Sequence, residues 1–248
     1  MKILLVDIET APHLGHVWAL WDQNVGLPQL IESGYILCWA AKWVGEPEIF
    51  FASKHNSTKK QMLKKIHKLL DVADVVVTYN GNRFDLPTLN AEFAEVGMFP
   101  PAPAKSFDLL KVVKSKFRLP SYKLEYVVKY FGVGKKLKNS GHELWVRCMA
   151  NDPAAWAEME QYNVHDTVLL EGLFEKLKPW IKGLLPPDHS GDLSTCRSCG
   201  SSNLHRRGFS FTHVSKFQRY QCQDCGSWGR SGANEISTET RKNILRPL

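Results

Sequence analysis

Residues 2–10 read KILLVDIET, an apolar run that ends in two carboxylates. Such a run of branched apolar residues predicts a buried central β-strand. Side chains at positions i and i+2 of a strand point to the same face, so Asp7 and Glu9 can reach one point in space. We therefore expect an acidic site at the end of this strand.

Two further acidic residues stand where they could join that site. Asp85 comes just after a second apolar strand, expected at Asp74–Tyr79, and a short turn. Asp166 lies on the last long helix, and Tyr162 precedes it by one helical turn, so the two side chains share a face. Four carboxylates from three elements would repel one another unless cations neutralised them. Two divalent ions are the usual solution.

Three stretches carry a family resemblance. They are VDIET at residues 6–10, YNGNRFDLP at residues 79–87 and YNVHD at residues 162–166. In this order and spacing they resemble the motifs of the four-carboxylate (DEDD) exonuclease superfamily in its tyrosine (DEDDy) form. The second stretch looks like that motif in the proofreading domain of family-B DNA polymerases. The resemblance covers roughly residues 1–180 and does not extend to a polymerase domain.

The resemblance implies a fold and a division of roles. The fold is α/β, an RNase H-like mixed sheet flanked by helices, and the activity is 3′–5′ exonuclease. The four acidic residues would hold two Mg²⁺ or Mn²⁺ ions, and Tyr162 would orient the attacking water. An unperturbed phenol is a poor base at neutral pH, which fits a positioning role. Asn80 and Phe84 would touch the terminal nucleotide, although Phe84 could equally be a core residue. The residues that hold the ions are Asp7, Glu9, Asp85 and Asp166.

Two tempting residues are left out of the site. His165 adjoins Asp166, but the histidine subclass of the family needs its histidine five positions before the aspartate, where this chain has Gln161. Adjacent helical side chains also point about 100° apart. Asp108 could be a fifth carboxylate, but a helix N-cap explains it as well.

Local patterns give a coarse order of elements. Further strands are expected at His16–Trp21, Tyr35–Val44 and Glu48–Ala52, from their aromatic and β-branched content. Helices are expected at residues 57–72, 84–96, 108–117, 123–130 and from Asp152-Pro153 to about Lys178. Strands first and helices later indicate an α/β or α+β sheet flanked by helices.

The six cysteines divide into two groups. Cys196 and Cys199, and Cys222 and Cys225, form two C-x₂-C pairs, each followed by glycine. The 22 residues between the pairs leave room for two strands, which is typical of a zinc ribbon. Four thiolates leave no open position, so one structural Zn²⁺ is expected. The other two cysteines, at positions 38 and 148, lie in apolar surroundings and are expected to be buried thiols.

Charge and composition suggest a polyanionic partner for the C-terminal part. The chain has a net charge of +7, and residues 190–248 hold nine Lys/Arg against four Asp/Glu. Mixed cations and aromatics can grip phosphates and stack bases. The alternatives are a miniature ribbon core or a docking surface for a replication or repair protein. The residues concerned are Arg206, Arg207, Phe209, Phe211, Lys216, Phe217, Arg219, Tyr220, Trp228 and Arg230.

These patterns predict four segments. They are a catalytic domain at 1–184, a linker at 185–195, a ribbon at 196–231 and a tail at 232–248 that is mobile or docks on a partner. The longest apolar runs are too short to span a bilayer, and the N-terminus does not match a signal peptide, so we expect a cytoplasmic protein in a reducing compartment.

The leading hypothesis is a 3′–5′ exonuclease on DNA, more than on RNA, with single-stranded or frayed ends preferred. A structure-specific endonuclease on the same scaffold is one alternative. A nucleic-acid-binding protein with a silent nuclease domain is another.

Overall fold

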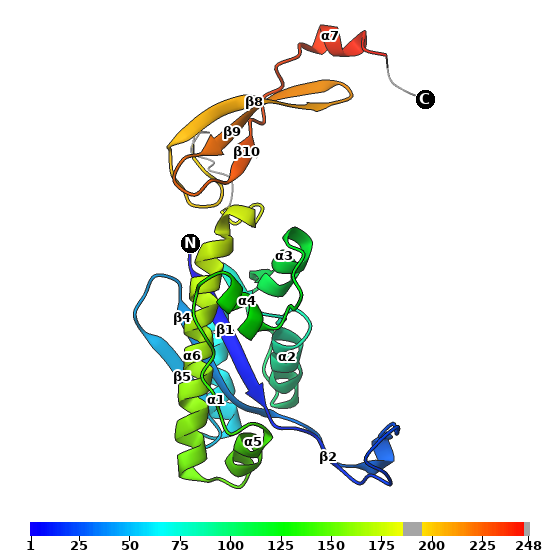
Figure 1. Ribbon diagram of the computed structural model, residues 1–248, viewed down its shortest axis with the longest axis vertical. Coiled ribbons are helices and arrows are strands. Elements are labelled where there is room, and N and C mark those ends of the chain that lie inside the picture. Colours follow the sequence, from blue (N-terminus) through cyan, green and yellow to red (C-terminus); the bar gives the residue numbers. More distant parts are fainter. Residues whose placement is uncertain (186–194, 246–248) are drawn as a thin grey trace. The chain divides into compact units, whose positions relative to one another are not determined.

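The structure is a computed structural model of the chain and describes residues 1–185 and 195–245. The chain divides into two compact units, Met1–Phe174 and Glu175–Leu248. The first unit is built on a five-stranded sheet in the order β5-β4-β1-β6-β7 (Figure 1). The strands are β1 (Ile3–Thr10), β4 (Ile36–Trp43), β5 (Ile49–Ser53), β6 (Val75–Thr78) and β7 (Lys105–Asp108).

Strand β1 is the central strand, as its apolar run predicts. It pairs antiparallel with β4 and parallel with β6, while β4 pairs antiparallel with β5 and β6 parallel with β7. Leu4, Leu5 and Val6 are completely buried, because β1 has a neighbouring strand on each side and helices over each face. The predicted fold class, a mixed α/β sheet flanked by helices, is confirmed.

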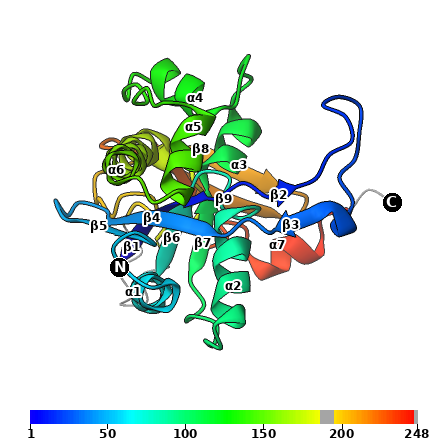
Figure 2. The same ribbon diagram turned by 90° about the horizontal axis from the view of Figure 1, so that it is seen from below.

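Alternate side chains of β1 face different helices. The even-numbered residues, from Leu4 to Ile8, pack in one core with α1 (Lys59–Asp71) and α2 (Asp85–Glu95). The other face of the sheet carries a second core under α5 (His142–Met149) and α6 (Pro153–Leu177). Figure 2 shows the two pairs of helices on opposite sides of the sheet. The odd-numbered positions 7 and 9 therefore face α5 and α6.

The remaining helices of this unit follow β7. They are α3 (Leu109–Lys116) and α4 (Leu124–Tyr130), close to the predicted bounds. The short strand β7 and the helix α5 were not predicted. β7 has only four residues, two of them charged and one polar, and its hydrogen-bonding partner lies thirty residues earlier in β6, which no local pattern reveals.

The prediction of a strand at His16–Trp21 is wrong. This segment belongs to an irregular arm with only two short strands, β2 (Leu14–Gly15) and β3 (Leu30–Glu32), and the 3₁₀ turn η1 (Leu27–Gln29). Its aromatic residues suit a strand, but the five-stranded sheet offers it no partner. The side chains of Gln23 and Gln29 form hydrogen bonds with backbone groups of this segment instead.

The second unit is a small antiparallel sheet. Its order is β10-β9-β8, from β8 (Leu204–Thr212), β9 (Ser215–Cys222) and β10 (Trp228–Arg230). The 3₁₀ turn η2 (Lys178–Trp180) precedes it, and the helix α7 (Thr238–Lys242) follows it. The start of the predicted tail is held to β9, because the backbone N–H of Glu235 donates a 2.8 Å hydrogen bond to the carbonyl of Lys216.

Most of the predicted linker and the last three residues of the tail lie outside the described residues. Cys38 and Cys148 are buried and unpaired, as expected. Among the described residues, no helix combines the length and the apolar character that crossing a bilayer requires.

Candidate functional site

Three of the four predicted carboxylates meet on one face of the sheet. Asp7 and Glu9 project from β1 toward α6, and Asp166 projects from α6 toward them. One oxygen from each residue lies within 4.8 Å of the oxygens of the other two. Asp7 and Glu9 lie two positions apart on β1, and α6 packs across that strand. Together these two features produce the acidic site predicted from sequence.

Asp85 adjoins this cluster from a different element. It is the first residue of α2, it is almost fully buried, and its Oδ1 accepts a hydrogen bond of 3.2 Å from the backbone N–H of Ile8. This bond fixes the Asp85 carboxylate beside β1, because its donor Ile8 lies between Asp7 and Glu9. Asp85 lies outside the group of oxygens within 4.8 Å, although its charge still raises the pKa of Asp7.

Burial and mutual repulsion make the carboxylates hard to ionise. Burial raises the pKa of Asp7 well above its usual range, and the charges of Glu9, Asp85 and Asp166 raise it further. Burial, and then the charge of Asp166, bring the pKa of Glu9 to about 7. Burial is also the main reason that the pKa of Asp85 is about 7. Such a site favours protons or metal cations at neutral pH.

One lysine partly neutralises the cluster. The Nζ of Lys136 lies 2.6 Å from Oδ2 of Asp166 and donates a 2.9 Å hydrogen bond to the hydroxyl of Tyr162. Burial alone would lower the pKa of Lys136, but the charge of Asp166 and these bonds outweigh it and raise that pKa. Sequence analysis missed Lys136, since it is one of three lysines within residues 135–138 and no pattern distinguishes it.

Tyr162 stands beside Asp166, as their spacing predicts. Burial, and then the charge of Asp166, raise the pKa of Tyr162 to about 12. The side chain therefore stays a neutral phenol at neutral pH and can donate or accept a hydrogen bond. The indole ring of Trp145 on α5 packs edge-on against it, with ring centroids 6.0 Å apart.

A buried asparagine orients Asp7. The side-chain N–H of Asn163 donates to Oδ2 of Asp7 at 2.6 Å, and Asn163 is completely buried on α6. Its carbonyl oxygen faces the thiol of Cys38 at 3.8 Å. Asn163 lies inside the third motif, next to Tyr162, but adjacent helical residues point in different directions, so sequence alone gave it no role.

The residues present fit divalent metal ions. Mg²⁺ and Mn²⁺ prefer carboxylate oxygens, and here three carboxylates converge with a fourth adjacent. Oδ1 of Asp166 is buried and has no hydrogen-bond partner among the described residues. A buried carboxylate oxygen without a partner is costly, and a cation at this point would remove that cost.

The second motif forms the turn between β6 and α2. Asn80 takes a left-handed conformation (φ 69°), and its backbone N–H donates to Oδ1 of Asp108 at 2.8 Å. A Cβ atom at Gly81 would lie 2.4 Å from the side chain of Thr78, so the turn requires glycine there. Phe84 is 44% exposed at the start of α2, which disfavours the core reading. The side chains of Asn80 and Phe84 are thus free to meet a ligand, and their contact with a nucleotide stays a prediction.

The two residues left out of the site have other roles. Oδ1 of Asp108 caps α3 by accepting a 3.0 Å hydrogen bond from the backbone N–H of Leu110. A ring nitrogen of His165 lies 2.8 Å from the backbone carbonyl of Lys135. Both observations agree with the sequence-based choice.

The four ribbon cysteines converge in the second unit. Their sulfur atoms lie within 4.8 Å of one another, with Cys196 and Cys225 at 3.6 Å and Cys199 and Cys222 at 3.7 Å. Thiolates around a tetrahedral zinc, with Zn–S bonds of about 2.3 Å, stand about 3.8 Å apart. A disulfide would need about 2.05 Å. The geometry therefore fits one zinc ion with four thiolates.

The two knuckles have the same backbone conformation. The residue after each second cysteine is glycine in the left-handed region, Gly200 at φ 81° and Gly226 at φ 76°. Each glycine N–H donates to the carbonyl of the first cysteine of its pair, Cys196 or Cys222. This matching turn is what the repeated C-x₂-C-G pattern predicts.

The cations and aromatics of the ribbon lie on two faces of its sheet. Trp228 and Arg230 on β10 pair with β9 in a register that puts them on one face with Phe217 and Arg219. Arg230 stacks on Phe217 at 4.0 Å and Arg219 lies 5.6 Å from the ring of Trp228. The opposite face holds Lys216, whose Nζ lies 3.9 Å from the centre of the Phe209 ring. These surfaces stay candidates for contact with nucleic acid or protein.

Comparisons with known proteins agree with this geometry. A family model described as the RNase_H superfamily matches residues 35–178. A DNA polymerase of Pyrococcus glycovorans is 28% identical over 165 residues, which cover 58% of this chain and 21% of that protein. DNA polymerase 1 of Pyrococcus abyssi is 25% identical over 167 residues, with the same coverage. The chain thus spans about a fifth of the length of the curated relatives it matches.

A solved structure shows the same fold. The family B DNA polymerase from the hyperthermophilic archaeon Pyrobaculum calidifontis superposes with a TM-score of 0.55 at 24% sequence identity. The superposition covers 72% of this chain and 24% of that one.

Proposed function

The chain belongs to the RNase_H superfamily, and on that premise we propose that it is a divalent-metal-dependent 3′–5′ exonuclease that hydrolyses phosphodiester bonds of DNA. The observation that carries the proposal is the convergence of Asp7, Glu9 and Asp166 within 4.8 Å, with Asp85 beside them. The relation to exonuclease domains of family-B DNA polymerases supports nuclease activity on DNA. Single-stranded or frayed ends are the preferred substrates.

Each carboxylate has a distinct position from which to hold a cation. Asp7 and Glu9 approach from β1, Asp166 from α6 and Asp85 from α2. When bound, two Mg²⁺ or Mn²⁺ ions would make a water nucleophilic at neutral pH and stabilise the charge that develops on the leaving 3′ oxygen. The hydrogen bonds from Asn163 and from Ile8 keep Asp7 and Asp85 in place for that role.

The neutral residues position substrate and water. The Tyr162 phenol, kept protonated by its raised pKa, orients the attacking water rather than removing its proton. Lys136 holds that phenol and supplies a positive charge where the phosphate approaches. Asn80 and Phe84 border the site from the turn before α2 and would contact the terminal nucleotide.

The presence of all four candidate metal-binding carboxylates and of the tyrosine argues against a silent nuclease domain. A binding protein that had lost catalysis would be free to lose a carboxylate or the tyrosine, and this chain has all five residues in place. The ribbon then acts as a second contact, through its basic aromatic faces, with nucleic acid or with a replication or repair protein.

The test is digestion of 5′-labelled single-stranded DNA, matched RNA and circular single-stranded DNA, with Mg²⁺, with Mn²⁺ and with EDTA. We expect a ladder that shortens from the 3′ end, needs the metal and leaves the circle intact. RNA should be degraded more slowly than DNA. Cutting of the circle would replace this proposal by the endonuclease reading.

Variants connect the activity to the site. Asp7→Asn and Asp166→Asn should abolish hydrolysis. Asp7→Asn should keep or raise the melting temperature, because it removes a repelling charge, whereas Asp166→Asn should lower it, because it also removes the ion pair with Lys136. Glu95→Gln, at an exposed carboxylate of α2, is the matched control and should retain activity. Activity that survives in either site variant would refute the assignment of the site.

A further inference from the structure

The arm at residues 12–34 leaves the fold at the candidate site. It starts directly after Ala11, two residues beyond Glu9, and re-enters the sheet at Tyr35, whose carbonyl accepts a 2.8 Å hydrogen bond from the N–H of Ala11. Figure 1 shows β1 pointing into this arm, with β2 in it. Both ends of the arm are therefore anchored at the end of the strand that holds the carboxylates.

Two half-buried glutamines of the arm bind the arm's own backbone. The backbone N–H groups of Trp18 and Ala19 donate to Oε1 of Gln23 at 3.2 and 3.3 Å. The side chain of Gln29 accepts from the N–H of Gly26 at 2.9 Å and donates to the carbonyl of His16 at 3.0 Å. Two glutamines thus take the place of a core and fix the loop.

Its apolar side chains point outward. Trp18 is 95% exposed, Trp21 82%, Leu20 84% and Leu27 85%. Single exposed apolar residues are ordinary, but four within ten positions on an ordered loop mark an interaction surface. No described residue of the chain covers these side chains.

Charge narrows the choice of partner. The chain has no lysine or arginine between Lys2 and Lys42, and the arm itself carries Asp22 and Glu32. The arm therefore does not offer a site that grips a phosphate backbone, and its apolar side chains suit a flat, uncharged surface. In a single strand, the faces of unpaired bases are such a surface, and tryptophan rings stack on them while leucines wedge between them.

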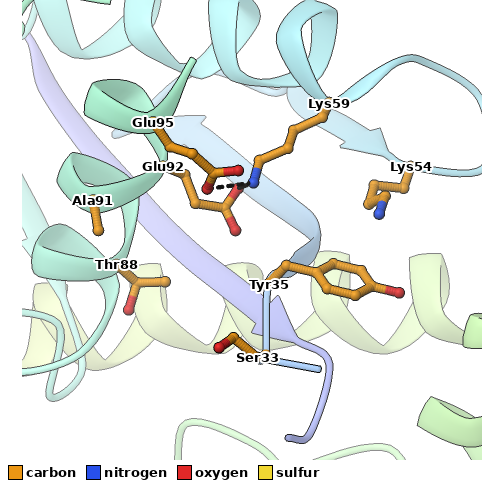
Figure 3. A pocket seen from close by; sticks show the side chains of 9 residues that line it. Ser33, Tyr35, Lys54, Lys59, Thr88, Ala91, Glu92 and Glu95 are labelled. Carbon is orange, nitrogen blue, oxygen red and sulfur yellow. Dashed lines mark hydrogen bonds and ion pairs between the residues drawn. The ribbon is translucent and has the colours of Figure 1, made fainter. Parts of the chain in front are cut away.

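The hollow at the base of the arm adds no net positive charge to this surface. It has a volume of about 320 Å³ and lies between the arm, at Ser33 and Gly34, and α2. Figure 3 shows its lysine at position 59 paired with Glu95, at 2.8 Å, while the other lysine, Lys54, lies 3.7 Å from the ring of Tyr35. The lining holds two lysines and two glutamates, so the hollow has no net positive charge and is not an anion site.

We propose that the arm binds unpaired bases of the substrate strand, upstream of the terminal nucleotide, with Trp18 and Trp21 as stacking platforms and Leu20 and Leu27 as wedges. The inference rests on the proposed nuclease function, because the arm starts beside the carboxylates that would hold the strand's 3′ end. It gives a physical reason for a preference for single strands, since bases of a duplex are already stacked and paired.

The test compares Trp18→Ala/Trp21→Ala with wild type in the full chain. Binding of a labelled oligothymidylate, longer than the 4–16 nucleotides or so of a single-strand site, is followed by anisotropy of the zinc-loaded chain in buffer without Mg²⁺ or Mn²⁺, so that the strand is not cleaved and the ribbon keeps its zinc. A base stacked on an aromatic ring contributes roughly 5- to 150-fold to affinity. The double variant should bind at least about 10-fold more weakly, with a smaller loss on blunt duplex.

Activity gives an independent readout. With metal present, KM for the long single strand should rise more than kcat falls, and the deficit should shrink as the strand is shortened to a dinucleotide. Phe99→Ala, which removes another highly exposed aromatic ring in the same unit, is the matched control and should bind and cleave like wild type. Unchanged binding by the tryptophan variant would overturn the proposal.

Two outcomes keep this proposal separate from the nuclease proposal. If wild type binds the oligonucleotide through the tryptophans but cleaves nothing, the arm's role holds and the nuclease function fails. If the double variant binds and cleaves normally but sediments as a smaller species than wild type, the arm covers a protein surface, and the base-binding proposal is wrong.

Discussion

Replacing Asn163 by leucine tests whether the buried asparagine sets the metal affinity of the site. Asn163 donates a 2.6 Å hydrogen bond to Oδ2 of Asp7 and is completely buried. Leucine has a similar volume but no donor, so Asp7 loses its fixed orientation without a large cavity. A hydrogen bond to a charged group contributes about 1.5–3 kcal/mol, which corresponds to roughly 10- to 150-fold in a binding constant.

The assay is calorimetric titration of the zinc-loaded full chain with Mn²⁺. We expect Asn163→Leu to bind Mn²⁺ about 10- to 100-fold more weakly, the range found when partners of metal ligands are removed. Without Mn²⁺, the zinc-loaded variant should also melt lower, because an unsatisfied buried polar group costs about 1–3 kcal/mol. At about 2–4 °C per kcal/mol for a chain of this size, the fall is roughly 2–12 °C.

Thr167→Val is the matched control on the same helix. The hydroxyl of Thr167 is buried and donates a 3.1 Å hydrogen bond to the backbone carbonyl of Asn163, but it touches no carboxylate. This variant should lower the melting temperature while its Mn²⁺ affinity stays close to wild type. If Asn163→Leu bound Mn²⁺ as tightly as wild type, the argument that this asparagine orients Asp7 would be refuted.

Three further predictions follow from the same structure. Between about pH 4 and 7, without Mg²⁺ or Mn²⁺, the free energy of unfolding of the first unit should fall as pH rises, because the fold raises the pKa values of Glu9 and Asp85 to about 7 and so favours their protonated forms. Hydrogen exchange of the β1 amides, measured across this pH range, should show the slope, and Glu9→Gln should reduce it. A slope that Glu9→Gln leaves unchanged would contradict this prediction. Gly81→Ala should destabilise the first unit by about 1–3 kcal/mol, because a Cβ there meets Thr78 at 2.4 Å, and denaturant melts would measure the loss. Cys222→Ser should abolish stoichiometric zinc binding and expose the amides of the ribbon to hydrogen exchange, while those of β1 stay protected; equal zinc content in variant and wild type would count against the four-thiolate site.

The site could be predicted from sequence where local geometry decides the position of a side chain. The i, i+2 spacing of Asp7 and Glu9 fixed their common face, and the i, i+4 spacing of Tyr162 and Asp166 fixed theirs. That β1 and α6 bring these pairs together came from the family resemblance and not from either spacing. The knuckle pattern similarly predicted four thiolates on one ion, because the turn that joins each pair is local.

Residues that support the site from outside the motifs could not be predicted. Lys136 lies on a connecting segment, and only the packing of that segment against α6 places its Nζ beside Asp166 and Tyr162. Trp145 comes from α5, a helix without a strong sequence signal, and reaches the same tyrosine. Contacts of this kind depend on tertiary structure, which no window along the chain contains.

The wrong strand at His16–Trp21 is informative for the same reason. Aromatic and aliphatic residues predict a strand because they normally need a core, and this segment has them without a core to fill. Two glutamines satisfy its backbone, so the apolar side chains contribute nothing that the described fold uses. Places where a local pattern and the fold disagree are expected at functional sites. An arm that keeps two exposed tryptophans beside a cluster of carboxylates is therefore better explained by a ligand than by folding.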